Sequence, residues 1–227
     1  ANIYHRHPGV MLMGANTVAE ATGGRMILGM GVSSPAIVSK VRGIDYGKPL
    51  AFLRTYLEAM EASMYTAVAP AESVPVVLAA LGPRMLELAA EKTAGAHPYN
   101  TTPEHTAMAR EVMGPDAGLF VEQKVIFTED PAVARATGGK VLRFYSRAPG
   151  YVNDLKRMGF SDDDISTQSD RLIDAIVAWG TADQIEARLQ EHADAGASHV
   201  CIHPLHPEDG QGQPDDDALV AFAPGNS

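Results

Sequence analysis

The sequence predicts an α/β fold built around a largely parallel sheet. Short apolar runs alternate along the chain with amphipathic helical patterns, an order typical of βα units. The apolar runs contain few polar residues, as expected of parallel strands that are buried on both faces. The chain has 227 residues, a length that suits one domain with a substantial core. We therefore expect residues 1–227 to form a single domain.

Six segments are predicted as strands. Each is a short apolar run, in most cases bounded by turn residues. The segments are residues 1–4, 26–32, 75–81, 94–97, 119–128 and 198–203.

Six helices are predicted between or beside these strands, at residues 8–21, 49–64, 83–92, 103–113, 131–146 and 182–195. Most of them begin with proline, which suits the first helical turn because no backbone hydrogen bond is lost there. The last one has Thr181 as its N-cap, Gln184 three residues later and Gly196 as its stop. Residues from about 147 to 180 do not fit a simple βα unit. We expect them to form a helical insertion before the last strand.

The strand count bears on which parallel architecture the chain adopts. About six βα units are visible, whereas a closed (β/α)8 barrel needs eight. For a barrel, the first two βα units would therefore be missing from this chain. A doubly wound open sheet is the competing architecture. Against it, Gly29 and Gly31 are followed by Val-Ser-Ser-Pro and not by the third glycine of a dinucleotide-binding fingerprint.

Composition and charge exclude several classes of partner. The chain has 18 Lys and Arg residues against 28 Asp and Glu, a net charge of −10, whereas nucleic-acid binding needs a basic face. It contains no apolar run of about 18 residues, and its start shows no signal-peptide pattern. The single Cys201 excludes an internal disulfide and fits a reducing compartment. We expect a cytoplasmic protein that binds a small-molecule substrate, without nucleic-acid or membrane partners.

In either parallel architecture the site lies beyond the carboxyl ends of the strands. The residues that follow the predicted strands are small, aromatic or imidazole-bearing, whereas Glu122 and Lys124 lie inside their strand. The candidates are Tyr4, His5, His7, Gly31, Val32, Ser33, Ser34, Gly82, Pro83, Arg84, His97, Pro98, Tyr99, Asn100, His203, Pro204 and His206.

The segment Gly82-Pro83-Arg84 is a candidate phosphate site between a strand and a helix. Gly82 allows close approach of the backbone, and Pro83 preorganises a helix start whose amides and dipole attract an anion. Arg84 would add a charge-assisted hydrogen bond to a phosphate. An ordinary strand-to-helix turn with a solvated Arg84 is the alternative.

The histidines at the predicted strand ends raise the possibility of a metal site. His5, His7, His97 and His203 would suit a metal-dependent barrel hydrolase, but such an enzyme also needs a carboxylate at the last strand, where SHVCIHPLH offers none. We expect no metal, and the hydrolase stays open as an alternative. No G-x-S-x-G nucleophile elbow is present, and Cys201 lies among core residues of a strand. We do not expect nucleophilic catalysis.

Five segments of the sequence resemble a known family. They are RMILGMGVSSP, YGKPLAFLRTYLEAM, PVVLAALGPRMLELAAEKTAGAHPYNTTPEHTAMAREVMGP, SDRLIDAIVAWG and DAGASHVCIHPL. They closely resemble the luciferase-like monooxygenase superfamily, in its actinobacterial coenzyme F-420-dependent oxidoreductase branch. The resemblance extends from residue 1 to about residue 205, and PVVLAALGPRMLELAAE followed by AGAHPY is its most specific part.

The resemblance implies a (β/α)8 TIM barrel of the bacterial luciferase-like type, with an insertion before the last strand and a flavin or deazaflavin across the carboxyl ends of the strands. Residues 1–4 would then be the third strand. Its segment Asn2-Ile3-Tyr4 would lie behind the deazaflavin ring, where many members have a non-proline cis peptide. The remaining implied contacts are Gly31, Val32 and Ser33 with the ring and side chain of the cofactor, and Leu81, Gly82, Pro83 and Arg84 with its phosphate.

The resemblance also implies the chemistry, which is hydride transfer between coenzyme F-420, an 8-hydroxy-5-deazaflavin, and a small organic substrate. The catalytic acid or base is expected among His5, His97 and Tyr99, of which His97 would face the pocket. Relatives that oxidise sugar phosphates carry a carboxylate where this chain has Ser33 and Ser34, so that substrate is not expected.

Two other functions within the same fold stay open. One is an FMN-dependent monooxygenase, which the identity of the cofactor would distinguish because a deazaflavin activates oxygen poorly. The other is a degenerate member that binds a ligand without catalysis. A homodimer is a further open expectation.

Overall fold

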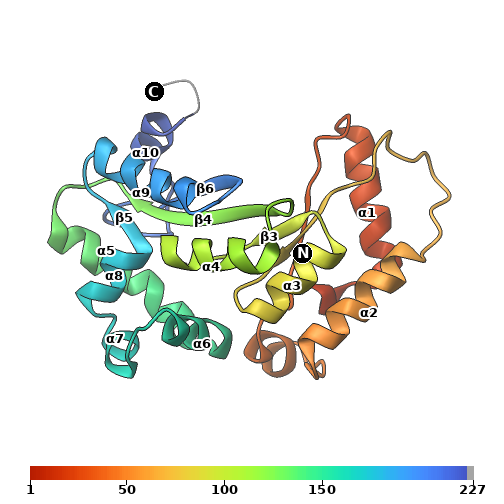
Figure 1. Ribbon diagram of the computed structural model, residues 1–227, viewed down its shortest axis with the longest axis horizontal. Coiled ribbons are helices and arrows are strands. Elements are labelled where there is room, and N and C mark those ends of the chain that lie inside the picture. The colour runs from red at the N-terminus through yellow and green to blue at the C-terminus, as the bar shows by residue number, and fades with distance from the viewer. Residues whose placement is uncertain (224–227) are drawn as a thin grey trace. The chain divides into compact units, whose positions relative to one another are not determined.

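The computed structural model describes residues 1–223 and confirms an α/β fold with parallel strands. The chain divides into two compact units. Unit 1 comprises Ala1–His97 and Val112–Gly118, and unit 2 comprises Pro98–Glu111 and the chain from Leu119 onward. Figure 1 shows their elements along the colour ramp from red at the N-terminus to blue at the C-terminus.

The sheet of unit 1 contains three parallel strands in the order β1, β2, β3, which are Leu28–Met30, Val76–Ala79 and Gly95–His97. Helices α1 (Pro8–Ala21), α2 (Pro49–Glu61) and α3 (Pro83–Lys92) accompany them (Figure 1). Each of these helices has proline in its first turn, as predicted from the sequence.

The prediction of a strand over residues 1–4 is wrong beyond its first residues. Asn2 forms only an isolated parallel bridge with Gly31, and residues Ile3–His5 form a 3₁₀ helix, η1. The cause is local, because the side chain of Asn2 accepts a hydrogen bond of 2.9 Å from the backbone N–H of Tyr4 and curls the chain. A second short helix, the π-helix η2 (Ala36–Val41), lies in the loop after β1 and was not predicted.

Unit 2 is built on the long strand β4 (Gly118–Ile126), which pairs in parallel with β5 (Val177–Trp179) and β6 (His199–Pro204). In the region where a helical insertion was predicted, α6 (Pro149–Arg157), α7 (Asp162–Thr167) and α8 (Asp170–Ile176) precede β5. The strand β5 itself was not predicted. Its Trp179 donates a 3.0 Å hydrogen bond from the indole N–H to Asp174.

The remaining helices of unit 2 are α5 (Pro131–Tyr145), α9 (Ala182–Asp194) and α10 (Asp216–Ala221), while α4 (Pro103–Met113) begins in unit 2 and ends in unit 1. The start of α9 has the predicted capping box between Thr181 and Gln184. Within residues 1–223, no helix is long and apolar enough to cross a membrane.

Candidate active site

The strand register of unit 1 places several of the predicted site residues in one row. Asn2 forms a bridge with Gly31, and Ala79 is paired with His97. Gly31 lies beside Ala79, since a Cβ atom built on Gly31 would be 3.1 Å from the Cβ of Ala79. Neighbours in register on parallel strands project to the same face of a sheet. The row Asn2, Gly31, Ala79 and His97 therefore lies on one face.

Small residues make up this face at Gly29, Gly31 and Ala79, while Val77, the register partner of Gly29, is buried on it. Gly29 and Ala79 are exposed, whereas Leu28, Met30 and Leu78, which point the other way, are buried in the core. A Cβ atom built on Gly29 would meet no other atom within 4 Å. This face consequently offers a flat floor of backbone and methyl groups, against which a planar ring can lie closely.

Tyr4 and Tyr46 form a pair that connects η1 to the loop after β1. The hydroxyl of Tyr4 donates a 2.6 Å hydrogen bond to the carbonyl of Tyr46, and the two rings stack with centroids 5.2 Å apart. The hydroxyl of Tyr46 donates in turn to the carbonyl of Ser33 at 3.3 Å. Burial, followed by the proximity of Tyr46 and Asp45, raises the pKa of Tyr4 to about 12. Tyr4 thus acts as a fixed hydrogen-bond donor at neutral pH.

Sequence reasoning missed Tyr46, because nothing in the local pattern distinguishes it from other loop aromatics. Sequence reasoning did identify Ser33. In the structure this residue has a φ of 56°, in the left-handed region.

The start of α3 has the geometry expected of an anion site. Gly82 is the N-cap in extended conformation, no side chain caps the helix, and Pro83 occupies its first turn. A pocket of about 630 Å³ lies along one side of α3, lined by Gly47, Lys48, Pro49, Leu50, Ala51, Arg54, Arg84, Glu87 and Glu91. The pocket thus lies between the start of α2 and the side of α3 that carries Arg84, Glu87 and Glu91.

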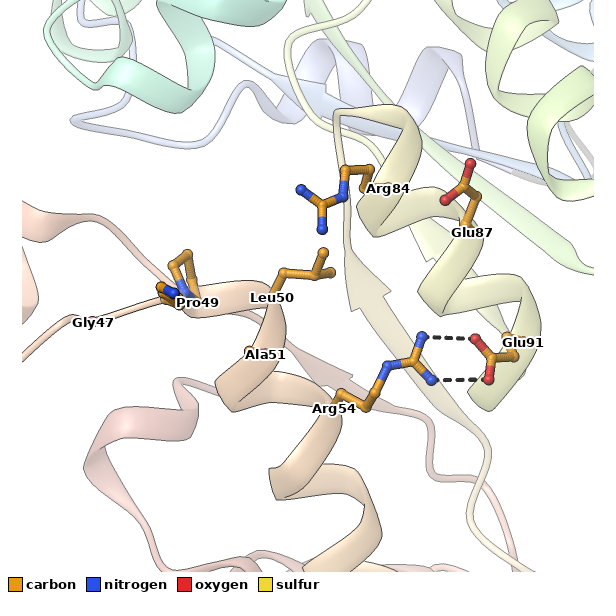
Figure 2. A pocket seen from close by; sticks show the side chains of 9 residues that line it. Gly47, Pro49, Leu50, Ala51, Arg54, Arg84, Glu87 and Glu91 are labelled. Carbon is orange, nitrogen blue, oxygen red and sulfur yellow. Dashed lines mark hydrogen bonds and ion pairs between the residues drawn. The ribbon is translucent and has the colours of Figure 1, made fainter.

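Two of the three cations in this pocket have no ion-pair partner among residues 1–223. Arg54 is neutralised by Glu91 through paired hydrogen bonds of 2.9 and 2.8 Å. Arg84 is exposed and reaches from the start of α3 toward the start of α2 (Figure 2). Lys48, which precedes Pro49, is the other unpaired cation. Their charges remain available for an anionic ligand.

The other predicted residues of unit 1 have varied environments. Ile3 is buried in the core with 1% of its surface exposed, so only its backbone lies near the row. Val32 and Leu81 are half-buried at the ends of β1 and β2. His5 is exposed at the end of η1 and is not part of the row. No cis peptide bond occurs within the described chain.

Unit 2 contains a buried polar cluster around Tyr99. Glu122 and Lys124, two residues apart on β4, are 5% and 0% exposed, and the Nζ atom of Lys124 lies 2.9 Å from Oε1 of Glu122. The same Oε1 lies 3.2 Å from Nδ1 of His203 on β6. Oε2 of Glu122 accepts a 3.3 Å hydrogen bond from the backbone N–H of Asn100.

Tyr99 completes this cluster. Its hydroxyl lies 3.1 Å from Nδ1 of His203 and 2.9 Å from the hydroxyl of Tyr145, and the Nζ atom of Lys124 lies 3.7 Å from the centre of its ring. Burial, reinforced by the Glu122 carboxylate, raises the pKa of Tyr99 far above its ordinary value. Tyr99 therefore stays neutral and cannot itself release its proton to solvent.

Burial disfavours the charged forms of both Glu122 and Lys124, but it determines the direction of the pKa shift only for Lys124. Burial disfavours the charged carboxylate, but His203 and Lys124 outweigh it and hold the pKa of Glu122 below its ordinary value. Burial lowers the pKa of Lys124, and Glu122 opposes this only in part. Sequence reasoning placed both residues in their strand without a role. The available signal was two opposite charges, two residues apart, inside an otherwise apolar strand.

Comparison with known proteins identifies the family. The family model described as luciferase-like monooxygenase matches residues 1–199. The chain belongs to this family. The predicted resemblance is thereby confirmed.

Two curated members of the luciferase-like monooxygenase family illustrate the relationship. One is a Mycobacterium tuberculosis protein named as a coenzyme F-420-dependent oxidoreductase, with that activity marked in its name as unproven. It is 25% identical over an alignment that covers 87% of this chain and 75% of the relative. The other is the 5,10-methylenetetrahydromethanopterin reductase of Archaeoglobus fulgidus, 25% identical over 91% of this chain and 76% of its own.

Solved structures of luciferase-like enzymes share the fold. The coenzyme F-420-dependent tetrahydromethanopterin reductase of Methanopyrus kandleri superimposes with a TM-score of 0.70 at 19% identity, covering 92% of this chain and 77% of its own. An F-420-dependent secondary alcohol dehydrogenase, solved with an F-420–acetone adduct, gives 0.67 at 14% identity, covering 88% and 70%. These likenesses establish the α/β fold of the luciferase-like type.

Proposed function

We propose that this chain is a coenzyme F-420-dependent oxidoreductase that transfers a hydride between the deazaflavin and a small organic substrate. The observation that carries the proposal is the flat floor of Gly29, Gly31 and Ala79 on the sheet of unit 1. The F-420 dependence stated in the names of the relatives supports the same cofactor.

The row of unit 1 fits the ring of the cofactor. Gly31 has no side chain and leaves room for an aromatic plane, while Val32 and Ser33 continue from it along the loop after β1. The backbone of Asn2 and Ile3 and the Tyr4–Tyr46 pair border the same region. When bound, the deazaflavin supplies or accepts the hydride. The residues named here hold the ring in place and shape its surroundings.

The start of α3 fits the phosphate of the cofactor. Leu81 leads from β2 into Gly82 and Pro83, and no side chain caps the start of the helix, where the helix dipole favours an anion. Arg84, with Lys48 nearby in the pocket, adds positive charge.

The catalytic acid or base remains a proposal among three residues. His97 shares the row with Gly31 and is the candidate best placed toward the ring. Tyr99 stays protonated and acts as a hydrogen-bond donor. His5, exposed at the end of η1, is the weakest of the three.

We further propose that units 1 and 2 belong to one (β/α)8 barrel domain over residues 1–227, in which the first two βα units lie outside this sequence. The strand count supports this proposal, as does the coverage of only about three quarters of each curated relative, 75% and 76%. A homodimer stays a prediction.

Fluorescence titration of the purified chain with reduced coenzyme F-420 and, separately, with FMN tests the proposed function. We expect saturable binding of coenzyme F-420, because the flat floor and the cations suit a planar ring and a phosphate. We expect much weaker binding of FMN, in line with the F-420 dependence in the names of the relatives. Tight binding of FMN without binding of coenzyme F-420 would show an FMN enzyme. Binding of neither would favour a degenerate member of the family.

A further inference from the structure

The chain turns sharply where it leaves β1, at the edge of the floor. Gly31 is fixed in the row, because its backbone N–H donates a 2.9 Å hydrogen bond to the carbonyl of Ala1 and its own carbonyl accepts a 3.2 Å hydrogen bond from the N–H of Ile3. Two residues later, Ser33 has a φ of 56°. A residue with a Cβ atom rarely keeps this left-handed conformation unless the surrounding structure holds it there.

Tyr46, near the far end of the same loop, supplies that support. Its hydroxyl donates a 3.3 Å hydrogen bond to the carbonyl of Ser33, 13 residues earlier. Its own backbone carbonyl accepts a 2.6 Å hydrogen bond from the hydroxyl of Tyr4. The side chain of Tyr46 thus holds the turn, and its backbone is held in turn by η1. These two hydrogen bonds form a tyrosine clamp, which closes the loop after β1 into a ring.

The loop between these ends has little packing of its own. Among residues 32–47, all of which the structure describes, only Val38 is fully buried. Gly43 and Gly47 both have positive φ values, of 68° and 50°. Glycine leaves the backbone free to adopt other conformations. Because few side chains anchor this loop, the hydrogen bonds at its ends select the conformation that it adopts.

Aromatic packing fixes the tyrosine clamp to the helix that follows the loop. The ring of Tyr4 packs against Phe52 of α2 with centroids 4.8 Å apart. Phe52 contacts Tyr56, whose hydroxyl donates a 2.9 Å hydrogen bond to the carbonyl of Arg6. Burial raises the pKa of Tyr46 above its ordinary value, so its hydroxyl keeps its proton and remains a donor at neutral pH.

Tyr46 also lies next to the pocket between α2 and α3. Gly47 and Lys48, the two residues that follow it, line this pocket together with Arg84. Figure 2 shows Gly47 where the chain enters α2. Because Lys48 is joined to Tyr46 through a single residue, a displacement of Tyr46 also moves Lys48. The same tyrosine therefore positions the turn at Ser33 beside the floor and a cation in the pocket.

We propose that Tyr46 is a positioning residue of the cofactor site, which holds Ser33 at the ring and Lys48 at the phosphate in one arrangement before the cofactor binds. This inference rests on the proposed function. A loop that is already ordered loses less conformational entropy on binding than a loop that the ligand must order. Tyr46 consequently contributes to affinity through the order of the loop.

The first test is fluorescence titration of the full chain with reduced coenzyme F-420. We expect Tyr46→Phe, which removes the hydroxyl but keeps the stacked ring, to weaken binding roughly threefold. This is in the lower part of the range for a neutral hydrogen bond, because 3.3 Å is long for a hydroxyl donor. Tyr46→Ala, which also removes the stacking with Tyr4, should weaken binding roughly tenfold or more.

The matched control is Tyr65→Phe, in the loop that leads into β2 and outside the floor, the tyrosine clamp and the pocket. It should leave the affinity unchanged. A wild-type chain that binds no coenzyme F-420 overturns the proposed function and the inference with it. A wild-type chain that binds the cofactor, with the same affinity as Tyr46→Phe and Tyr46→Ala, overturns the inference alone.

A double-mutant cycle with Ser33→Gly separates positioning from a general loss of stability. Glycine adopts a φ near 56° without support, so the loss of affinity caused by Tyr46→Phe should be smaller when residue 33 is glycine. If Tyr46 only stabilised unit 1 as a whole, the loss would be the same with serine or glycine at that position. Additive effects of the two substitutions therefore contradict the inference.

A second test needs no cofactor. Amide hydrogen exchange of the full chain measures how often the backbone of the loop opens. We expect Tyr46→Phe to speed exchange several-fold within residues 33–48 and to leave α3 at its wild-type rate, because only the loop loses a support. Equal exchange of the loop in the wild-type and Tyr46→Phe chains would show that the tyrosine clamp does not order it.

Discussion

Arg84 lies at the start of α3, where the proposed phosphate would bind, and has no ion-pair partner among residues 1–223. Replacing it by alanine removes one charge-assisted hydrogen bond. We expect Arg84→Ala to weaken binding of coenzyme F-420 roughly tenfold, measured by fluorescence titration. The matched control is Lys92→Ala at the other end of the same helix, which should leave the affinity unchanged. Equal affinities for the two variants would assign Arg84 to the solvated surface.

His192 makes the stability of unit 2 depend on pH. It is fully buried, its Nδ1 lies 2.8 Å from the hydroxyl of Thr106, and its Nε2 lies 2.9 Å from Oε1 of Gln123. Burial lowers its pKa from 6.5 to about 4. Between these two values the unfolded chain binds the proton and the folded chain does not, so stability is lost as the pH falls through this window.

The expected loss between about pH 7 and about pH 5 is ~2 kcal/mol in the free energy of unfolding from this residue. Denaturant titrations at the two pH values measure it. His192→Gln should be less stable at neutral pH but should show a smaller difference between the two conditions. An unchanged pH difference in this variant would mean that other groups cause it.

Single residues also show where sequence reasoning reaches its limit. His97, Gly31 and Arg84 were identified because each lies at or near the carboxyl end of an apolar run, and local chain order predicts that position. The contact of Glu122 with His203 was not predictable, because it depends on the pairing of β4 with β6 across 81 residues of sequence. A strand pattern gives the face of a residue but does not give the partner strand.

Among the elements, strands β1 and β3 each contain a glycine, but the two glycines have opposite requirements. Gly95 has a φ of 154°, and a Cβ atom built on it would lie 2.0 Å from the carbonyl oxygen of Gly118. Gly29 has open space at the corresponding point. Gly95 is therefore needed for folding, whereas Gly29 leaves room on the exposed face.

We expect Gly95→Ala to lower the free energy of unfolding by roughly 2–4 kcal/mol, because backbone cannot move aside as a flexible side chain can. Gly29→Ala should change it by less than ~1 kcal/mol and should instead weaken binding of coenzyme F-420, because its methyl group projects into the floor. Chemical denaturation and fluorescence titration of both variants measure these effects. Unaltered binding by a folded Gly29→Ala chain would place the ring elsewhere.

The helices were the most predictable elements. Helices α1, α3 and α4 have the predicted bounds, because proline marks their first turn and the apolar spacing continues to their ends. The 3₁₀ helix η1 was not predictable as such, since a single side-chain hydrogen bond from Asn2 overrides the strand pattern of its neighbours. Strand β5 follows α8 without an intervening turn, so no punctuation in the sequence separates them.

For the whole molecule, the family motifs along the sequence predicted the fold more narrowly than the periodicity of apolar residues did. Periodicity alone left a barrel and an open doubly wound sheet as alternatives, because both are made of the same βα units. The motifs identified the family, and the family model over residues 1–199 confirms it. Neither source predicted the buried cluster of unit 2, whose members come from β4, β6, α5 and the segment after β3.

The position of Trp179 has a practical consequence for following the two units separately. It lies on β5 in unit 2, fixed by Asp174, and it is the single tryptophan of the chain. Its emission therefore serves as an intrinsic optical label for unit 2, while unit 1 contributes no indole signal. Unit 1 can be given a label of its own by introducing one tryptophan there and replacing Trp179 by phenylalanine, so that the unfolding of each unit is recorded at the same wavelength in separate variants.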